Sequence, residues 1–178
     1  DNGKPYRTYT HELCQGVQEL SRLADVIVPN RTEAAILLGM AYDEITLDRE
    51  EDCQQWAKEL SLKGRRSVVL TGVSLAPDRI GAACFDRETG DVEIVSAPRV
   101  EGSFHGTGDI FASVLTGGLV RGMDLPTAAA LAADFTALCA RRTAEQANPE
   151  REGVDFEPLL GLLTQDSLRK ATAAEKMS

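Results

Sequence analysis

Short apolar runs alternate along the chain with amphipathic stretches of helical length. The apolar runs are bounded by turn residues, and several of the stretches between them carry apolar residues at spacings of three and four. The pattern predicts strands over residues 24–29, 67–72, 79–86 and 91–96. It predicts helices over residues 11–23, 30–38, 46–62, 125–146 and 156–163, and a further helix that begins within residues 104–115.

Buried strands that alternate with helices are typical of α/β proteins. We therefore predict a mostly parallel sheet flanked by helices. A Thr89-Gly90 turn joins the last two predicted strands, so these should form an antiparallel hairpin. At 178 residues the chain can bury one core, and no internal repeat or low-complexity linker divides it.

Three stretches with functional side chains lie at the ends of predicted strands. Asn30–Glu33 follows the first strand, Thr71-Gly72 ends the second, and Gly106–Asp109 follows the hairpin. Ligands of open α/β sheets bind beyond the carboxyl ends of the strands. The sequence therefore predicts one ligand site at that edge.

The stretch Gly106–Asp109 opens a helix whose apolar side, including Ile110 and Leu115, can face a core. Unpaired N–H groups at a helix N-terminus attract anions, and small residues let a phosphate approach closely. Asp109 stands in the same turn, where it either stabilises the helix dipole or takes a proton from a hydroxyl beside the phosphate. The second possibility indicates phosphoryl transfer to an alcohol. The first leaves only a loop-to-helix junction.

Asn30 and Glu33 are three residues apart, which places an amide and a carboxylate on one helical face. Such a pair suits Mg²⁺, which keeps much of its hydration shell. The same two residues also fit a capping box, with Asn30 as N-cap and Glu33 as the third helical residue. Both interpretations stay open at this point.

Composition narrows the range of partners. With 19 basic and 28 acidic residues, the formal net charge of −9 argues against nucleic acid or an anionic membrane as a general partner. The four cysteines show no metal-binding spacing, and no uninterrupted run of apolar residues is long enough to span a membrane. We therefore expect reduced thiols, a cytoplasmic location and a small-molecule substrate.

The motif G-T-G-D over residues 106–109 resembles the signature of the ribokinase-like superfamily. The longer string H-G-T-G-D-I-F-A-S-V-L-T-G over residues 105–117 is similar to the pyridoxal kinase branch. The resemblance implies a ribokinase-like fold and ATP-dependent phosphorylation of the 5′-hydroxymethyl group of pyridoxal, pyridoxine or pyridoxamine. It implies that Asp109 is the catalytic base and that Gly106, Thr107 and Gly108 form the anion hole for the transferred phosphoryl group.

The same resemblance implies ATP and Mg²⁺ as cofactors, and a homodimer in the full-length protein. Residues 30–33 match its N-x-x-E motif, residues 97–104 match the wall of the adenine pocket, and Tyr6 falls where the family has a mobile flap. Asp1 matches the last aspartate of a D-P-V-x-G-D-type motif near the metal. The residues implied for ATP are Asn30, Glu33, Thr71, Gly72, Val100 and Phe104, and those implied for the metal are Glu33 and Asp1.

Compared with that family, the chain resembles the C-terminal, nucleotide-binding half over residues 1–167, with residues 168–178 as a flexible tail. A partial domain leaves two alternatives open. One is a hydroxymethylpyrimidine (phosphate) kinase, a branch with the same fold that typically carries cysteine where this chain has Asp109. The other is a non-catalytic nucleotide-binding fragment, because the N-terminal half of the family supplies much of the vitamin pocket and most of the dimer interface.

Overall fold

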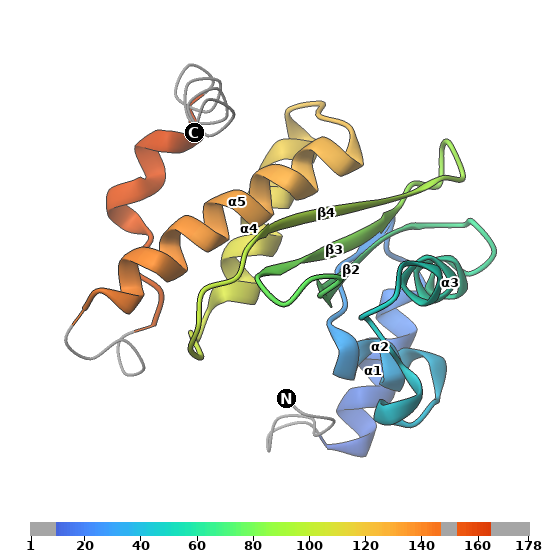
Figure 1. The fold of residues 1–178 in the computed structure, drawn as a ribbon. Coiled ribbons are helices and arrows are strands. Elements are labelled where there is room, and N and C mark those ends of the chain that lie inside the picture. The colour runs from blue at the N-terminus through green and yellow to red at the C-terminus, as the bar shows by residue number, and fades with distance from the viewer. Residues whose placement is uncertain (1–9, 147–152, 165–178) are drawn as a thin grey trace.

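The structure is a computed structural model that describes residues 10–146 and 153–164. Figure 1 shows its helices and strands along the chain. In chain order they are α1 (His11–Ser21), β1 (Val26–Ile27), α2 (Arg31–Leu38), the 3-10 turn η1 (Tyr42–Glu44), α3 (Glu50–Leu60), β2 (Ser67–Val73), β3 (Arg79–Phe85), β4 (Val92–Pro98), α4 (Thr107–Val120), α5 (Leu125–Ala144) and the 3-10 helix η2 (Glu157–Leu163).

The four strands form one sheet with α2 and α3 on one face and α4 and α5 on the other (Figure 1). Alternation along β2 shows how the sequence builds these layers. Val69 packs with the core cluster of α4 and α5, whereas Val68 and Leu70 pack with the cluster of α2 and α3. Because both faces are covered, β2 is apolar at successive positions rather than at every second one.

The sheet order is β1-β2-β3-β4, with β1 parallel to β2 and antiparallel pairing from β2 to β3 and from β3 to β4. The α/β class, the flanking helices and the β3–β4 hairpin are thus confirmed. The prediction of a mostly parallel sheet is wrong for the strands described. Residues 74–78 alone join β2 to β3, which is too short for the crossover that parallel strands require.

Polar side chains fix where several helices begin. The Thr10 hydroxyl accepts a hydrogen bond from the Leu13 N–H at 3.2 Å at the start of α1, and the Asp124 carboxylate accepts one from the Thr127 N–H at 2.8 Å at the start of α5. These bonds satisfy donors that the first helical turn leaves unpaired. The bonds from Thr127 hold the pKa of Asp124 below its usual value.

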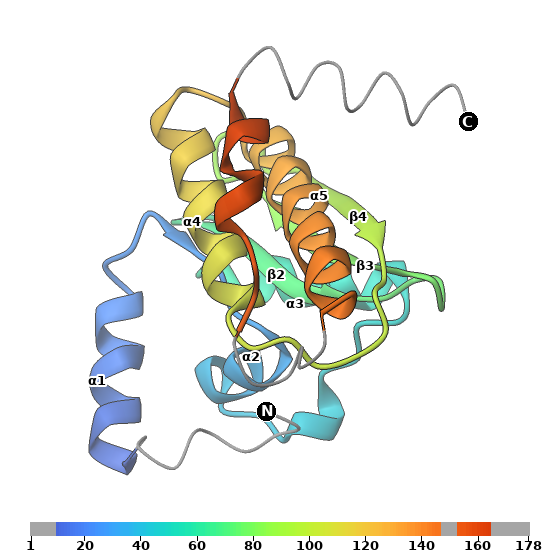
Figure 2. The same cartoon turned by 90° about the vertical axis from the view of Figure 1, so that its left-hand side faces the viewer.

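Helices α4 and α5 pack closely because small residues line their contact. Ala128, Ala129 and Ala132 of α5 are fully buried, and a Cβ placed on Gly118 of α4 would lie 3.0 Å from the Cβ of Ala128. The expectation that the alanine-rich stretch allows close packing is met. η2 then crosses over α4 and α5 (Figure 2), where Leu159 and Leu163 pack against their cluster.

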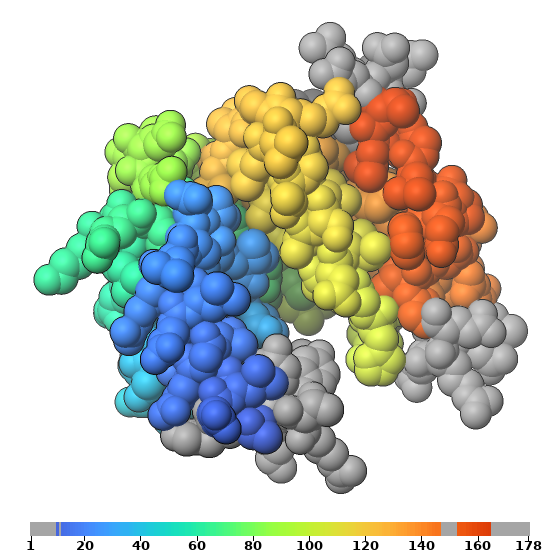
Figure 3. All heavy atoms as spheres, turned by 180° about the vertical axis from the view of Figure 1, so that it is seen from behind, coloured from blue at the N-terminus to red at the C-terminus, as the bar shows by residue number. Residues whose placement is uncertain are grey.

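Viewed from behind, α4 runs along the surface between the N-terminal part of the chain and the C-terminal segment (Figure 3). Its last residue, Val120, is 83% exposed, whereas Leu115 is buried. In the part of the chain that the structure describes, no helix has both the length and the apolar character needed to cross a bilayer.

Candidate active site

The carboxyl ends of β1, β2 and β4 share one edge of the sheet, as the pairing directions require. Two backbone hydrogen bonds tie the segments at this edge together. The Thr71 N–H donates to the Pro29 carbonyl at 2.9 Å, and the Arg99 N–H donates to the Asp78 carbonyl at 2.8 Å. The edge therefore gathers the residues that follow β1, the end of β2 and the start of the loop that leads to α4.

The N-terminus of α4 is open to an approaching anion. Gly106 is the N-cap, with φ 94° and ψ −2°, and no side chain caps the helix. The Thr107 hydroxyl turns back to donate to the Phe104 carbonyl at 3.1 Å. A Cβ on Gly106 or Gly108 would meet no atom within 4 Å, so the first turn lies free of packing atoms. This arrangement has the form of an anion site at a helix N-terminus.

Asp109 stands in that turn with an exposed side chain. With His105, Gly106 and Ile110 it lines a hollow of about 460 Å³, whose other wall is Gln146 and residues 153–157. None of the ion pairs found among the described residues includes Asp109. Its carboxylate is therefore available both to solvent and to a ligand in the hollow.

Asp155, another acidic residue that lines the hollow, is held by the protein itself. Arg142 Nε and Gln146 Nε2 each donate to its Oδ2 atom at 2.7 Å. The buried Thr143 hydroxyl accepts from the Asp155 N–H at 3.0 Å and fixes the backbone there. Asp155 thus has a structural role, which distinguishes it from Asp109. Sequence reasoning missed residues 153–157 as a wall of the site, because no motif marks that loop.

Asn30 and Glu33 form the capping box that the sequence left open. Asn30 Oδ1 accepts from the Glu33 N–H at 3.0 Å, and Glu33 Oε2 accepts from the Asn30 N–H at 2.9 Å. These bonds engage one oxygen of the carboxylate and leave Glu33 Oε1 and Asn30 Nδ2 outside the box. A hydrated Mg²⁺ needs only one or two protein carboxylates together with phosphate oxygens. The cap and the metal role are therefore compatible.

Thr71 and Gly72 lie inside β2, which continues to Val73, so the prediction that they end the strand is wrong. The pairing register shifts between Thr71 and Val73, and Gly72 has φ 87°. This bulge carries the strand past the position where its regular pairing stops. The Thr71 hydroxyl donates to the Pro29 carbonyl at 3.3 Å, so Thr71 holds the residue before Asn30 in place.

The loop from β4 to α4 holds the residues expected around adenine. Phe104 is half-buried against the cluster of α4 and α5, and its ring covers Gly102, whose φ is 123°. Val100 is half-buried in the same loop. The other two residues implied by the family resemblance, Asp1 and Tyr6, lie outside the described residues.

Metal-binding clusters are not evident in the described part of the chain, where no three His, Cys, Asp or Glu side chains gather closely enough to hold an ion. The four cysteines carry free thiols, and Cys53, Cys84 and Cys139 are buried. Burial raises the pKa of Cys84 to about 12. The three buried thiols, whose pKa values are all raised, therefore stay protonated at neutral pH.

Comparison with known proteins decides the family. A sequence profile described as phosphomethylpyrimidine kinase matches residues 6–153. The chain belongs to this family. One similar protein is pyridoxine kinase from Bacillus subtilis, which is 33% identical over 122 residues; these are 66% of this chain and 42% of that protein.

Solved structures of a phosphomethylpyrimidine kinase and of a pyridoxal kinase have the same fold as this chain. Pyridoxal kinase from Lactobacillus plantarum matches with a TM-score of 0.79 and 31% identity, over 92% of this chain and 57% of that one. A Bacteroides thetaiotaomicron protein assigned to the phosphomethylpyrimidine kinases, in a crystal form with pyridoxal, matches with a TM-score of 0.82 and 32% identity, over 92% and 57% of the two chains. The predicted resemblance to pyridoxal kinases is confirmed.

This chain spans only part of the length of those proteins. It covers 42% of the Bacillus subtilis protein and 57% of each of the two structures. The matched part includes both segments that the structure brings to the sheet edge, Asn30–Glu33 and Gly106–Asp109. The family match therefore covers the motif residues of the candidate site, whereas residues 154–157 of the opposite wall of the hollow lie beyond the matched range.

Proposed function

We propose that this chain is the nucleotide-binding part, residues 1–167, of an ATP-dependent kinase that phosphorylates the 5′-hydroxymethyl group of a B6 vitamer. The observation that carries the proposal is the carboxylate of Asp109, which forms no ion pair with another described residue and stands in the first turn of a helix without a side-chain cap, beside a hollow. Phosphoryl transfer needs little covalent chemistry from the protein, but it needs positioning and charge stabilisation. An anion site with an adjacent base supplies both.

In this proposal Asp109 takes the proton of the substrate hydroxymethyl group as its oxygen bonds to the terminal phosphorus of ATP, while the bond from that phosphorus to the bridging oxygen breaks and ADP leaves. The N–H groups of Gly106, Thr107 and Gly108 stabilise the negative charge on that phosphoryl group, because they are fixed before the reaction starts. Glu33 Oε1 would hold a hydrated Mg²⁺, and Asn30 Nδ2 would donate a hydrogen bond to a phosphate oxygen or to a metal-bound water; the ion would supply neutralising charge at the ATP phosphates. Gly72, Val100 and Phe104 contact the rest of the nucleotide.

Thr71 combines two roles in this arrangement. Its hydroxyl and its N–H both donate to the Pro29 carbonyl, so the hydroxyl oxygen can take part in further bonds only as an acceptor or a ligand. The hydroxyl therefore contacts a phosphate through water or Mg²⁺ rather than by donating its own hydrogen. Replacing Thr71 should disturb both Asn30 and the phosphates.

A hydroxymethylpyrimidine (phosphate) kinase is the second candidate, since the matched family is described by that activity. The B6 reaction is preferred because Asp109 stands where that branch typically carries cysteine. Free and mostly buried thiols suit the cytoplasm, the proposed location. A homodimeric full-length protein stays a prediction.

The proposal is tested by measuring phosphorylated product from ATP and pyridoxal, with hydroxymethylpyrimidine as the competing acceptor. Asp109→Asn should lower the rate about 10²- to 10⁴-fold, because the base is lost. Asp91→Asn, an exposed aspartate at the β3–β4 turn, is the matched control and should leave the rate unchanged. Product from hydroxymethylpyrimidine alone would favour the second candidate. ATP binding without any product would leave only a nucleotide-binding fragment.

A further inference from the structure

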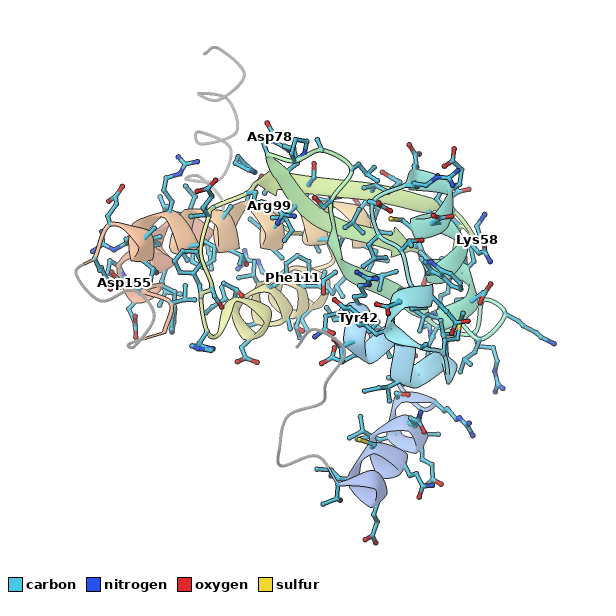
Figure 4. All side chains as sticks on the ribbon, turned by 60° about the horizontal axis from the view of Figure 1, so that its bottom comes forward. Tyr42, Lys58, Asp78, Arg99, Phe111 and Asp155 are labelled. Atoms are coloured by element: carbon cyan, nitrogen blue, oxygen red, sulfur yellow. The ribbon has the colours of Figure 1, made fainter. Side chains whose placement is uncertain are left out.

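Arg99 is the first residue after β4, at the edge of the sheet where the proposed nucleotide lies, and Figure 4 labels it together with Asp78. Its side chain is exposed but held in place. Arg99 Nη2 donates to Ser74 Oγ at 2.9 Å, and the Arg99 N–H donates to the Asp78 carbonyl at 2.8 Å. Ser74 Oγ in turn lies 3.2 Å from the carbonyl oxygens of Ala76 and Arg79. The guanidinium group is therefore fixed over the β2–β3 connection.

This position puts a cation between two segments expected to contact phosphate. Ser74 follows the Thr71–Val73 bulge of β2 directly, and residues 100–106 lead from Arg99 to the N-terminus of α4. A Cβ on Gly72 would touch only Leu47 Cδ1, at 3.9 Å, so the backbone at the bulge is open to a ligand. Arg99 thus links the residue after the β2 bulge, through its bond to Ser74, with the loop that leads to the N-terminus of α4.

The charge of Arg99 has no carboxylate partner in the described part of the chain. A guanidinium group has five N–H donors, and one of them bonds to Ser74. Asp78, whose carbonyl accepts from the Arg99 N–H, and Glu101, two residues after Arg99, are exposed, yet none of the ion pairs among the described residues includes Arg99. Arg79 differs because two of its side-chain nitrogens donate to Ser96: Nε to the hydroxyl at 3.1 Å and Nη2 to the carbonyl.

We infer that Arg99 binds the phosphate oxygens of the nucleotide, with Ser74 as the residue that positions its guanidinium group. The inference rests on the proposed function and changes the role of Arg99, which the family resemblance places in the wall of the adenine pocket. A planar guanidinium fork matches phosphate geometry and forms charge-assisted hydrogen bonds. In a chain of net charge −9, such a local cation offsets the repulsion that a polyanion meets.

The opposing explanation is that Arg99 serves only as a strut between β4 and the β2–β3 connection. The two explanations differ in how they treat ligands of different charge. A phosphate contact should discriminate ATP from adenosine, whereas a strut that shapes the edge should affect both ligands equally. They also differ at Ser74, because Ser74→Ala breaks the strut but keeps the positive charge.

The test is equilibrium binding of ATP, ADP and adenosine to the wild-type protein and to four variants, without a vitamer acceptor. Arg99→Gln should weaken ATP binding about 10- to 100-fold, the expected range for losing a hydrogen-bonded charge, and leave adenosine unchanged. Arg99→Lys should retain part of the affinity, and Ser74→Ala should lose only a few-fold. Arg121→Gln removes the same charge at the far end of α4, about 20 Å from Gly106, and should change nothing.

Equal losses for ATP and adenosine, or a Ser74→Ala loss as large as that of Arg99→Gln, would overturn the inference in favour of the strut. Unchanged ATP binding in Arg99→Gln would also overturn it. Thermal unfolding of each variant identifies any that has lost its fold, and Arg99→Lys then carries the test. If the wild-type protein binds ATP, only the inference about Arg99 is at stake. If it binds no ATP, the proposed function fails as well.

Discussion

Gly117 and Gly118 are adjacent in α4, and we expect the same substitution to shift stability in opposite directions at the two positions. Gly117 is exposed, and a Cβ there would meet nothing within 4 Å. Gly118 is buried, and its Cβ would lie 3.0 Å from Ala128 Cβ and 3.2 Å from Met123 Sδ. The two sites share the same helix and backbone conformation, so the contact with α5 is the main difference between them.

The magnitudes follow from two opposing terms. Alanine in a helix interior is favoured over glycine by about 1 kcal/mol, so Gly117→Ala should raise the free energy of unfolding by about that amount. Gly118→Ala gains the same term but adds a methyl group to a closed contact, which costs about 1–3 kcal/mol. Ala128 is fully buried in α5 and has no side chain that can move aside. The net effect at Gly118 is a loss of up to about 2 kcal/mol.

Urea unfolding followed by circular dichroism measures both effects, with the fluorescence of Trp56 as a second probe. Trp56 packs against the cluster of α2 and α3, on the opposite face of the sheet, so agreement of the two probes shows that the layers unfold together. For a chain of this length, 1 kcal/mol corresponds to about 2–4 °C in Tm. If both variants are stabilised equally, α4 and α5 do not pack at Gly118 and the reasoning is refuted.

Two further outcomes follow from side chains with altered acidity. Asp124→Ala should lower the free energy of unfolding by about 1 kcal/mol near pH 7, because α5 loses its N-cap. The folded-state pKa of Asp124 is lowered, so this stabilisation is present above the usual aspartate pKa and is lost as pH falls. Denaturation at about pH 3 should therefore show a smaller difference in stability between the variant and the wild type. An equal difference at both pH values would contradict the role of Asp124 as a cap. Burial is the main cause that raises the pKa values of Cys53, Cys84 and Cys139, to about 11, 12 and 11. A thiol reagent near pH 8 should therefore modify only Cys14 in the folded protein, and mass spectrometry counts the modified cysteines. Rapid labelling of a second cysteine would show that a core cluster is open.

The sequence predicts helix positions well because the signals that set them are local. Thr10, Asn30 and Asp124 all lie next to the helices that they cap. The predicted helix over residues 46–62 shows the limit, since α3 begins only at Glu50. The Thr46 hydroxyl donates to Asp52 Oδ2 at 2.8 Å and the Leu47 carbonyl accepts from the Ser74 N–H, so tertiary contacts keep the preceding residues extended.

The direction of the strands and the make-up of the site depend on contacts between distant segments. The alternation of strands and helices indicates a parallel sheet, but the short connection before Arg79 reverses β3. The motif at Gly106–Asp109 predicts the anion site, whereas the opposite wall of the hollow comes from residues 153–157. Arg99 had one weak signal in the sequence, a cation directly after a strand, and its bond to Ser74 becomes visible only in the fold.

The sheet divides the interior into two separate apolar clusters, and the ligand edge draws on both. Asn30 and Glu33 begin a helix of one layer, whereas Gly106 and Asp109 begin a helix of the other. Partial opening of either layer would therefore separate the proposed metal-binding residues from the base while leaving the opposite layer folded. A ligand that contacts both layers at this edge would prevent either layer from opening alone. Amide hydrogens of α2 and α4 should therefore gain protection from solvent exchange together when nucleotide binds.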